Sequence, residues 1–309
     1  MPFIPIHIDN NIQGAVLYIL RYYDVFRYPL KREEIHNNCP ILCHINSIDK
    51  ALSLLEADMA VYKYKDYYSI APDIKQLVRR REKANDLAKE HIKSAIRVGK
   101  FIYSFPFVRF VSISGSLSKG YADANTDYDF FIVTKHNRLW ICRTLLHLFK
   151  KLTFLVGKQH QFCMNYFIDS EHLEIEEKNI YTAIELHSII PISGVSVYSG
   201  IIRQNKWLSQ YIPNGYLRLY PKTRAEKKDG FIKKCLEFLL DHLSPSKLNE
   251  WLMHKTDIRW RKKWFSKNYP EEDYSLAFKT TLYHSKNHPH NYQKKVLNIL
   301  ENHVDKKHH

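Results

Sequence analysis

The chain has 309 residues, 45% hydrophobic and 26% charged, and its 47 basic and 32 acidic residues give a formal net charge of +15. This composition is typical of a globular protein and excludes a disordered or collagen-like chain. No stretch approaches the ~20 apolar residues of a membrane-spanning helix, the N-terminus lacks the features of a secretory signal, and the five cysteines form no disulfide or zinc framework. We therefore expect a cytoplasmic protein with reduced cysteines and no membrane partner.

The length indicates two or more domains, and the first is expected over residues 1–72. GAVLYILRYYDVF has helical periodicity, LKREEIHNN follows a proline, and SIDKALSLLEAD forms a third candidate helix capped by Ser47. The alternating VYKYKDYYSI then predicts a two-stranded hairpin. Three helices followed by a hairpin resemble a winged helix, which implies either DNA binding through the third helix or a packing module.

Residues 73–215 are expected to form a second domain, which opens with a long amphipathic helix that ends near Phe101. The three arginines Arg79, Arg80 and Arg81 are predicted to lie on its solvated face, and contact with a phosphate is the alternative. Strands are expected in VRFVSIS, FFIVT and QFCMNYFID, with a helix in RLWICRTLLHLFKKLTFL between the second and third strands. NIYTAIELHSII is expected to continue as a helix to Pro191.

Residues 216–309 are expected to form a basic, helical C-terminal region. Basic residues alternate with aromatic ones in DIRWRKKWFSKNYP and HSKNHPHNYQKKVL, a pattern that suits either nucleic-acid contact or a solvated helix face with aromatic anchors. A homodimer face containing Trp251, Trp260 and Trp264 is a further hypothesis.

The segment SGSLSKGYADANTDYDFFIV, residues 114–133, contains the chemically informative motif. Gly115 ends a strand and permits a tight turn whose amides and Ser116 hydroxyl can bind phosphate, and Gly120 permits a second close approach. Asp127 and Asp129 are two residues apart at the head of a strand, so their carboxylates lie on one face. Two such carboxylates favour a divalent cation with oxygen ligands.

Gly115-Ser116, Gly120 and Thr126-Asp127-x-Asp129 resemble the motif of the DNA polymerase β-like nucleotidyltransferases. This resemblance implies a mixed sheet flanked by helices, and thus an α+β protein with a nucleotidyltransferase domain between a winged-helix-like domain and a helical C-terminal region. It also implies a Mg²⁺ (or Mn²⁺) cofactor, an NTP substrate, and transfer of a nucleoside monophosphate with release of pyrophosphate.

The same resemblance assigns roles to individual residues. Gly115, Ser116, Lys119, Gly120 and Thr126 would bind the nucleotide, and Asp127 and Asp129 would bind the metals. Charge alone adds Arg138 and Arg143 as candidates to neutralise the triphosphate, with plain solvent exposure as the alternative. Asn205 and Trp207 either frame a base or acceptor pocket or belong to the core.

Members of this superfamily usually carry a third carboxylate on the next long strand, where it activates the acceptor hydroxyl. In this chain the central position of that strand is Asn165, which cannot act as a base. Asp169, in phase at the strand end, is one candidate for the third catalytic carboxylate, Glu185 on the next helix is another, and its absence is the remaining alternative.

Two other functions compete with a transferase. One is a winged-helix DNA-binding or nucleotide-sensing protein with a catalytically weak transferase domain, which the uncertain third carboxylate favours. The other is a toxin-like enzyme that modifies a protein or transfer RNA. The acceptor, whether a small molecule, a protein or RNA, and the nucleobase are not encoded in these spacings.

Overall fold

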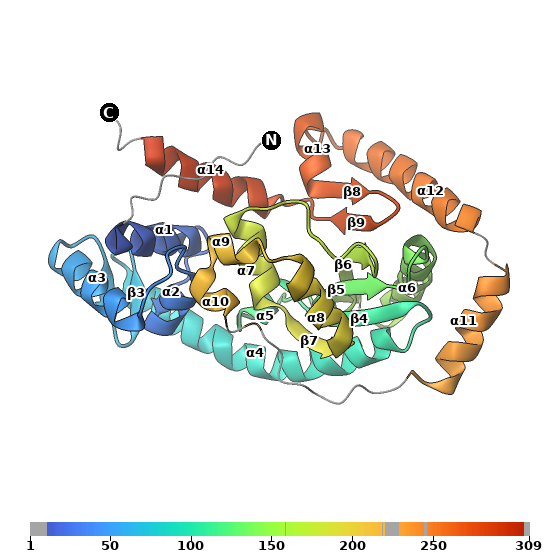
Figure 1. The fold of residues 1–309 in the computed structure, drawn as a ribbon, viewed down its shortest axis with the longest axis horizontal. Helices are drawn as coiled ribbons and strands as arrows, with labels where there is room; N and C mark the ends of the chain where they lie inside the picture. Colours follow the sequence, from blue (N-terminus) through green and yellow to red (C-terminus); the bar gives the residue numbers. More distant parts are fainter. Residues whose placement is uncertain (1–10, 158, 218, 220–228, 244–245, 306–309) are drawn as a thin grey trace.

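The computed structural model describes residues 11–157, 159–217, 219, 229–243 and 246–305 (Figure 1). The protein is an α+β protein in which a small N-terminal unit packs beside a mixed six-stranded sheet. The expected absence of a secretory signal concerns residues that lie outside this description. Each described helix is too short or too polar to cross a bilayer.

The N-terminal unit contains three helices and a three-stranded antiparallel sheet in the order β1-β3-β2. Its elements are α1 (Ile12–Asp24), β1 (Leu30–Lys31), α2 (Arg32–Asn38), α3 (Ile45–Ala57), β2 (Tyr62–Tyr64) and β3 (Tyr67–Ser69). Sequence periodicity predicted the helices and the hairpin but not β1, because two residues are too short to show alternation. Helix α3 begins before Ser47, and the His44 side chain caps it by accepting a hydrogen bond from the Asn46 amide at 3.3 Å.

The long helix α4 (Ile74–Tyr103) was predicted correctly and runs beneath both the N-terminal unit and the main sheet (Figure 1). The expectation that all three arginines lie on its solvated face is wrong for Arg81. Arg81 is buried, forms an ion pair with Glu34 of α2 at 2.6 Å, and lies over the rings of Tyr28 and Tyr67. This arginine therefore joins the helix to the N-terminal unit.

The main sheet has the strand order β7-β4-β5-β6-β9-β8. Its strands are β4 (Val108–Ile113), β5 (Asp129–Thr134), β6 (Cys163–Asp169), β7 (Ile190–Ser193), β8 (Phe278–Thr280) and β9 (His284–Asn287). Strands β5 and β6 are parallel, and the other neighbours are antiparallel. Because β5 and β6 are parallel, their first residues lie side by side at the same end of the sheet.

Helices cover both faces of this sheet. Phe130 and Ile132 of β5 pack with α4 and with α6 (Leu139–Thr153), whereas Phe131 and Val133 pack with α7 (Ile180–Ser188) and α8 (Val195–Gln204). The short segments that connect or follow these elements are α5 (Gly115–Ser118), η1 (Phe154–Val156), η2 (Gln159–Gln161), α9 (Leu208–Tyr211) and α10 (Pro213–Tyr216). The alternation of β5 between two apolar cores explains its continuous run of hydrophobic residues.

The expected helix that ends at Pro191 is shorter than predicted, because α7 ends at Ser188 and residues 190–193 form β7. The proline fits there because β7 is an edge strand of the sheet.

The C-terminal region is not entirely helical, because β8 and β9 form a hairpin that extends the main sheet beside β6. The helices of this region are α11 (Phe231–Leu243), α12 (Ser246–Phe265), α13 (Glu271–Ala277) and α14 (Tyr292–Asp305). Trp260 and Trp264 of α12 pack with Phe278 in a small core of their own. These two tryptophans therefore anchor the hairpin, whereas Trp251 is exposed.

Candidate active site

The site is built where β5 begins. Asp129 is the first residue of β5, and Asp127 lies two residues earlier in the connecting loop. Asp127 is partly exposed, and its carboxylate lies 2.7 Å from Nδ1 of His160. Cys163, the first residue of β6, lies at the same end of the sheet and pairs with Asp129 in the parallel register.

Gly115 lies against Asp129. The Ser114 amide donates to the Asp129 carbonyl at 2.9 Å, which draws the start of the glycine turn onto the start of β5. Gly115 has φ +67°, and a Cβ at this position would lie 2.6 Å from Oδ2 of Asp129. Only glycine combines this backbone conformation with this close approach. Ser116, the next residue, is exposed beside the turn.

The far end of the turn is fixed by groups from distant parts of the chain. The Gly120 carbonyl accepts a hydrogen bond from Nδ2 of Asn85 on α4, and the Lys119 carbonyl accepts one from the Tyr28 hydroxyl at 3.0 Å. Nζ of Lys119 lies 2.7 Å from Oε1 of Glu185. Sequence reasoning missed Asn85, Tyr28 and His160, since none carries a local motif.

Thr126 closes the loop that precedes the two aspartates. Its hydroxyl accepts a hydrogen bond from the Asp123 amide at 2.6 Å and lies 3.2 Å from the Asp123 carboxylate. The predicted nucleotide-binding residue therefore shapes the loop in this structure, and its hydroxyl is directed back to Asp123.

The predicted third carboxylate Asp169 does not join this site. Strands β5 and β6 pair from Asp129 with Cys163 to Thr134 with Asp169, so Asp169 lies at the opposite end of the strands, about 17 Å away at ~3.3 Å per residue. A register shift between Phe130 and Phe131 also inserts one extra residue into β6, which places Asp169 on the face opposite to Asp129.

Asn165 and Glu185 are the residues that do reach Asp129. Nδ2 of Asn165 donates to Oδ1 of Asp129 at 2.9 Å, and Glu185 of α7 is close enough for its charge to raise the pKa of Asp129. Of the two third-carboxylate candidates, the structure brings Glu185 to the site and leaves Asp169 away from it.

The electrostatics of Asp129 are unusual for an aspartate. Burial raises its pKa to about 7, and the Asp127 and Glu185 carboxylates contribute to the increase, against the opposing effects of Asn165 and Lys119. A cation between the carboxylates would remove this repulsion and keep Asp129 ionised. The residues present therefore fit a hard divalent cation, whose preferred ligands are carboxylate oxygens.

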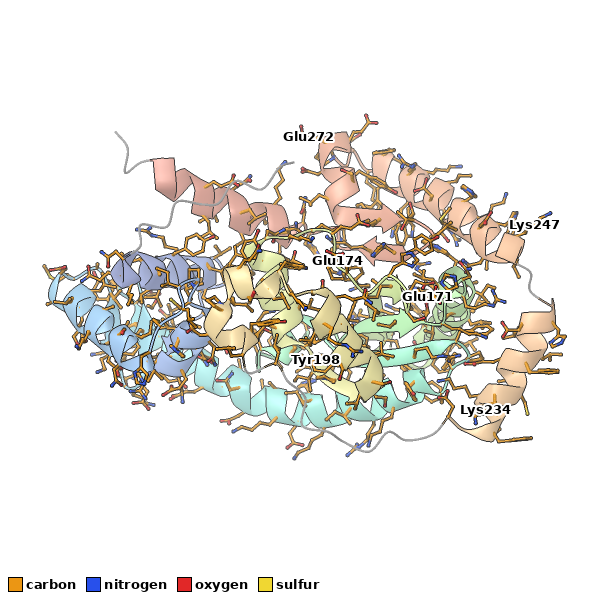
Figure 2. The ribbon with its side chains drawn as sticks, in the orientation of Figure 1. Glu171, Glu174, Tyr198, Lys234, Lys247 and Glu272 are labelled. Atoms are coloured by element: carbon orange, nitrogen blue, oxygen red, sulfur yellow. The ribbon has the colours of Figure 1, made fainter. Side chains whose placement is uncertain are left out.

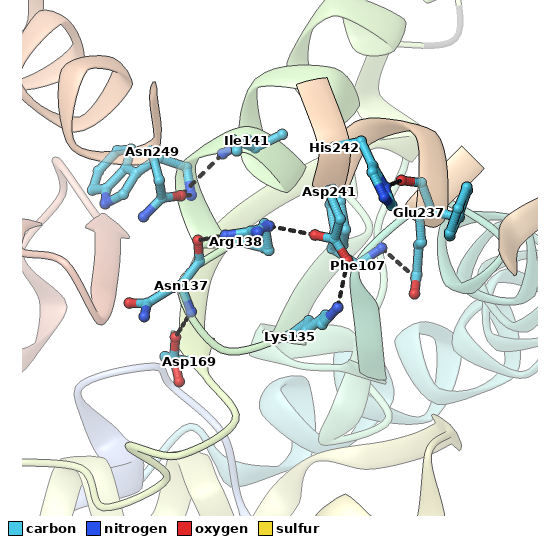
Figure 3. A network of polar contacts seen from close by, with 12 residues as sticks. Phe107, Lys135, Asn137, Arg138, Ile141, Asp169, Glu237, Asp241, His242 and Asn249 are labelled. Atoms are coloured by element: carbon cyan, nitrogen blue, oxygen red, sulfur yellow. Dashed lines mark hydrogen bonds and ion pairs between the residues drawn. The ribbon is translucent and has the colours of Figure 1, made fainter. Parts of the chain in front are cut away.

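Asp169 instead organises the other end of the sheet (Figure 3). It is fully buried and accepts hydrogen bonds from the amides of Asn137 at 2.8 Å and Glu171 at 2.9 Å. Arg138 of the same loop forms an ion pair with Asp241 of α11 at 2.7 Å, and Arg143 is buried over the ring of Trp260. Neither arginine is placed to bind a triphosphate at the start of β5.

Asn205 and Trp207 belong to the core, which was the alternative to a role in framing a pocket. Asn205 is fully buried, accepts hydrogen bonds from the Ile175 amide and the Trp207 indole, and donates to the carbonyls of Leu173 and Ile201. These contacts satisfy the side chain and fix the loop before α7.

Comparisons with protein-family models, with curated proteins and with solved structures find no match for this chain.

Proposed function

We propose that the protein is a metal-dependent nucleotidyltransferase that moves a nucleoside monophosphate from an NTP to an acceptor and releases pyrophosphate. The observation that carries the proposal is the contact between the glycine turn and the paired aspartates. Gly115 leaves no room for a side chain beside Oδ2 of Asp129. A phosphate held at the turn would therefore lie next to carboxylates that need a cation.

Asp127 and Asp129 would hold Mg²⁺ or Mn²⁺. When bound, such an ion neutralises phosphate charge and orients the reacting oxygens. Asn165 positions Asp129, because its Nδ2 hydrogen bond at 2.9 Å fixes one carboxylate oxygen and leaves the other directed at Gly115. His160 fixes the exposed Asp127 in the same way through its contact at 2.7 Å.

Lys119, the exposed Ser116 and the turn amides would bind the phosphates. The Lys119 side chain is partly buried, so its ammonium group is not fully hydrated. In the structure its charge is balanced by Glu185, whose Oε1 lies 2.7 Å from Nζ of Lys119. A bound triphosphate would compete for Lys119 and release the Glu185 carboxylate.

Glu185 is the candidate base. Once released from Lys119, its carboxylate would accept the proton of the acceptor hydroxyl as the acceptor oxygen bonds to the α-phosphorus and the bond to pyrophosphate breaks. Helix α7 carries Glu185 across the face of the sheet on which Asp129 lies, so acceptor and nucleotide would meet between α7 and the glycine turn.

Calorimetric titration with each of the four NTPs, with and without Mg²⁺, tests this proposal. The wild-type protein is expected to bind at least one NTP only with Mg²⁺, and the double variant Asp127→Asn/Asp129→Asn is expected to lose binding. The matched control Asp86→Asn changes an exposed aspartate of α4 paired with Lys89 and should bind normally. Absence of NTP binding by the wild-type protein, or equal binding by the double variant, would refute the proposal.

Duplex DNA binding is a second candidate, favoured by the succession of three helices and a three-stranded sheet in the N-terminal unit. The charge of α3 opposes it, because the exposed side chains of its outer face include Lys50 but also Glu56. Lys65, in the turn between β2 and β3, forms an ion pair with Glu82 of α4 at 2.9 Å.

Fluorescence anisotropy with labelled duplex DNA at low salt tests this second candidate. Binding that weakens with salt and with Lys50→Gln/Lys63→Gln would support it. No change in anisotropy would exclude it, and the transferase proposal would be unaffected.

A further inference from the structure

A cluster of metal-ligating side chains lies at the other end of β5 and β6 from the candidate active site. Among the described residues, the potential ligand atoms of His136, Asp169 and His172 all lie within 4.8 Å of one another. His136 belongs to the loop after β5, Asp169 ends β6, and His172 follows it. We propose that these three side chains form a structural site for a divalent transition-metal ion of the Zn²⁺ class.

The imidazole rings of His136 and His172 both point a nitrogen toward the same carboxylate oxygen of Asp169. Oδ1 of Asp169 lies 3.1 Å from Nδ1 of His136 and 3.6 Å from Nδ1 of His172. The first distance suits a hydrogen bond, but the second exceeds one. Nδ1 of His172 is buried and has no hydrogen-bond partner within the described part of the chain. A cation between the three atoms would satisfy this nitrogen, which otherwise carries a desolvation cost.

The surrounding contacts hold the ligands in place. Asp169 is anchored by the two backbone amides described above. The Asn137 side-chain amide lies 2.8 Å from Nε2 of His136, and with this amide turned over its oxygen accepts the Nε2 proton and leaves Nδ1 for the ion. The ring of His172 stacks on Tyr283, with centroids 3.5 Å apart. The two histidine side chains are 36% and 38% exposed, which leaves a route for an ion to enter.

The donor set selects the class of metal. Two imidazoles and one carboxylate suit Zn²⁺ and related ions, whereas Mg²⁺ and Ca²⁺ prefer oxygen ligands. Glu171, labelled in Figure 2, lies in the same segment, and its Oε2 is 3.3 Å from Nδ1 of His136. The Glu171 side chain is 65% exposed and lies outside the three-residue cluster, so it would have to turn toward the ion to become a fourth ligand.

Such a site would join three segments of the chain. The Asp169 amide donates to the Tyr283 carbonyl at 3.0 Å, so the turn between β8 and β9 already rests on the end of β6. A bound ion would fix the loop after β5 and the segment after β6 to this turn. The site would stabilise the fold, in contrast to the reactive metal proposed at Asp127 and Asp129.

The test is Zn²⁺ titration of the chelator-treated full-length protein against a chromophoric competitor, combined with thermal unfolding. The wild-type protein is expected to bind one Zn²⁺ tightly and to unfold at a higher temperature with Zn²⁺. His136→Ala and His172→Phe are expected to weaken binding at least about ten-fold and to abolish the thermal shift. Phenylalanine preserves stacking on Tyr283, so His172→Phe removes the ligand atom with little change in packing.

Two controls separate this site from others. His254→Ala removes an exposed histidine of α12, and Asp127→Asn/Asp129→Asn removes the proposed reactive site; both should retain tight Zn²⁺ binding. Equal Zn²⁺ affinity in the wild-type protein and in folded His136→Ala/His172→Phe would overturn the proposal. A wild-type protein without saturable Zn²⁺ binding would also overturn it. Neither result depends on nucleotide binding.

Discussion

At the scale of single residues, the chemistry of Asp129 depends on the absence of a side chain at Gly115. The carboxylate occupies the space that a Cβ at position 115 would need, and the backbone there has φ +67°. The same carboxylate has its pKa raised by burial and by neighbouring carboxylates. Each of these two features leads to a measurable prediction.

Gly115→Ala is expected to destabilise the protein by more than its conformation alone would cost. A non-glycine residue in the left-handed region costs about 1–2 kcal/mol, and the contact with Asp129 adds to this. Gly157→Ala is the matched control, because Gly157 has φ +66° and no atom within 4 Å of the added Cβ. Denaturant unfolding of both variants measures the difference, and equal losses of stability would show that the clash is relieved at no cost.

Asp129→Asn is expected to stabilise the metal-free protein relative to the wild-type protein, and to do so more at pH 8 than at pH 5. Folding raises the carboxyl pKa from 3.8 to about 7, so the folded state pays a penalty that is absent below about pH 4 and complete above about pH 7. Asparagine removes the penalty and can keep the contact with Asn165.

Thermal unfolding in chelator at pH 5 and pH 8 measures this effect. The variant should gain several degrees over the wild-type protein at pH 8, since 1 kcal/mol corresponds to about 2–4 °C in domains of ~150–250 residues. For the control Asp86→Asn, the difference in unfolding temperature from the wild-type protein should be the same at both pH values. If the difference between Asp129→Asn and the wild-type protein also does not change with pH, the pKa assigned to Asp129 is contradicted.

At the scale of elements, the sequence predicted which strands exist better than how they pair. The alternation of QFCMNYFID correctly indicates a strand, and it puts Asn165 and Asp169 on one face. The extra residue in β6 breaks that alternation and moves Asp169 to the other face. A bulge depends on the partner strand, so a single strand's pattern cannot show it.

The hairpin of β8 and β9 was missed for a related reason. Its strands have three and four residues, and they gain stability by pairing with β6 and packing on Trp260 and Trp264. The Gly-Ser turn and Asp129, in contrast, lie at neighbouring strand ends as predicted, because a turn after one strand and a charge before the next are local signals. The prediction that Asp127 shares a strand face with Asp129 is wrong, because β5 begins at Asp129 and Asp127 belongs to the loop before it.

Removal of the partner of Arg81 provides the prediction at this scale. Glu34→Gln is expected to cost about 1–3 kcal/mol, because the Arg81 side chain is 5% exposed and its charge would be left without a carboxylate. Glu82→Gln breaks the exposed pair with Lys65 and should cost no more than about 1 kcal/mol. Denaturant unfolding gives both values, and similar small losses would mean that Arg81 finds another partner.

At the scale of the whole molecule, the N-terminal unit and the sheet are joined by α10 as well as by α4. Asn214 of α10 is buried, accepts a hydrogen bond from the Cys43 amide at 3.1 Å, and donates to the carbonyls of Ile41 and Cys39. One side chain thus satisfies three backbone groups in the loop between α2 and α3.

Asn214→Ala is expected to loosen this junction, because it leaves a buried amide without a partner at a cost of about 1–3 kcal/mol. Hydrogen exchange should increase in residues 39–45 while β5 stays protected. Gln210→Ala, an exposed change on the neighbouring α9, is the control and should leave exchange unchanged. Uniformly faster exchange over the whole chain would indicate global destabilisation and contradict a local role.

The hydroxyl of Tyr28 bound to the Lys119 carbonyl has a practical consequence for protein engineering. A shortened protein starting at α4 would retain every residue of the segment 114–133 and yet lack the group that supports its turn. If the proposed function holds, such a fragment should bind nucleotide poorly even with all of its carboxylates intact. Excision of the N-terminal unit and substitution of Tyr28 by phenylalanine in the full chain are therefore expected to impair the same turn.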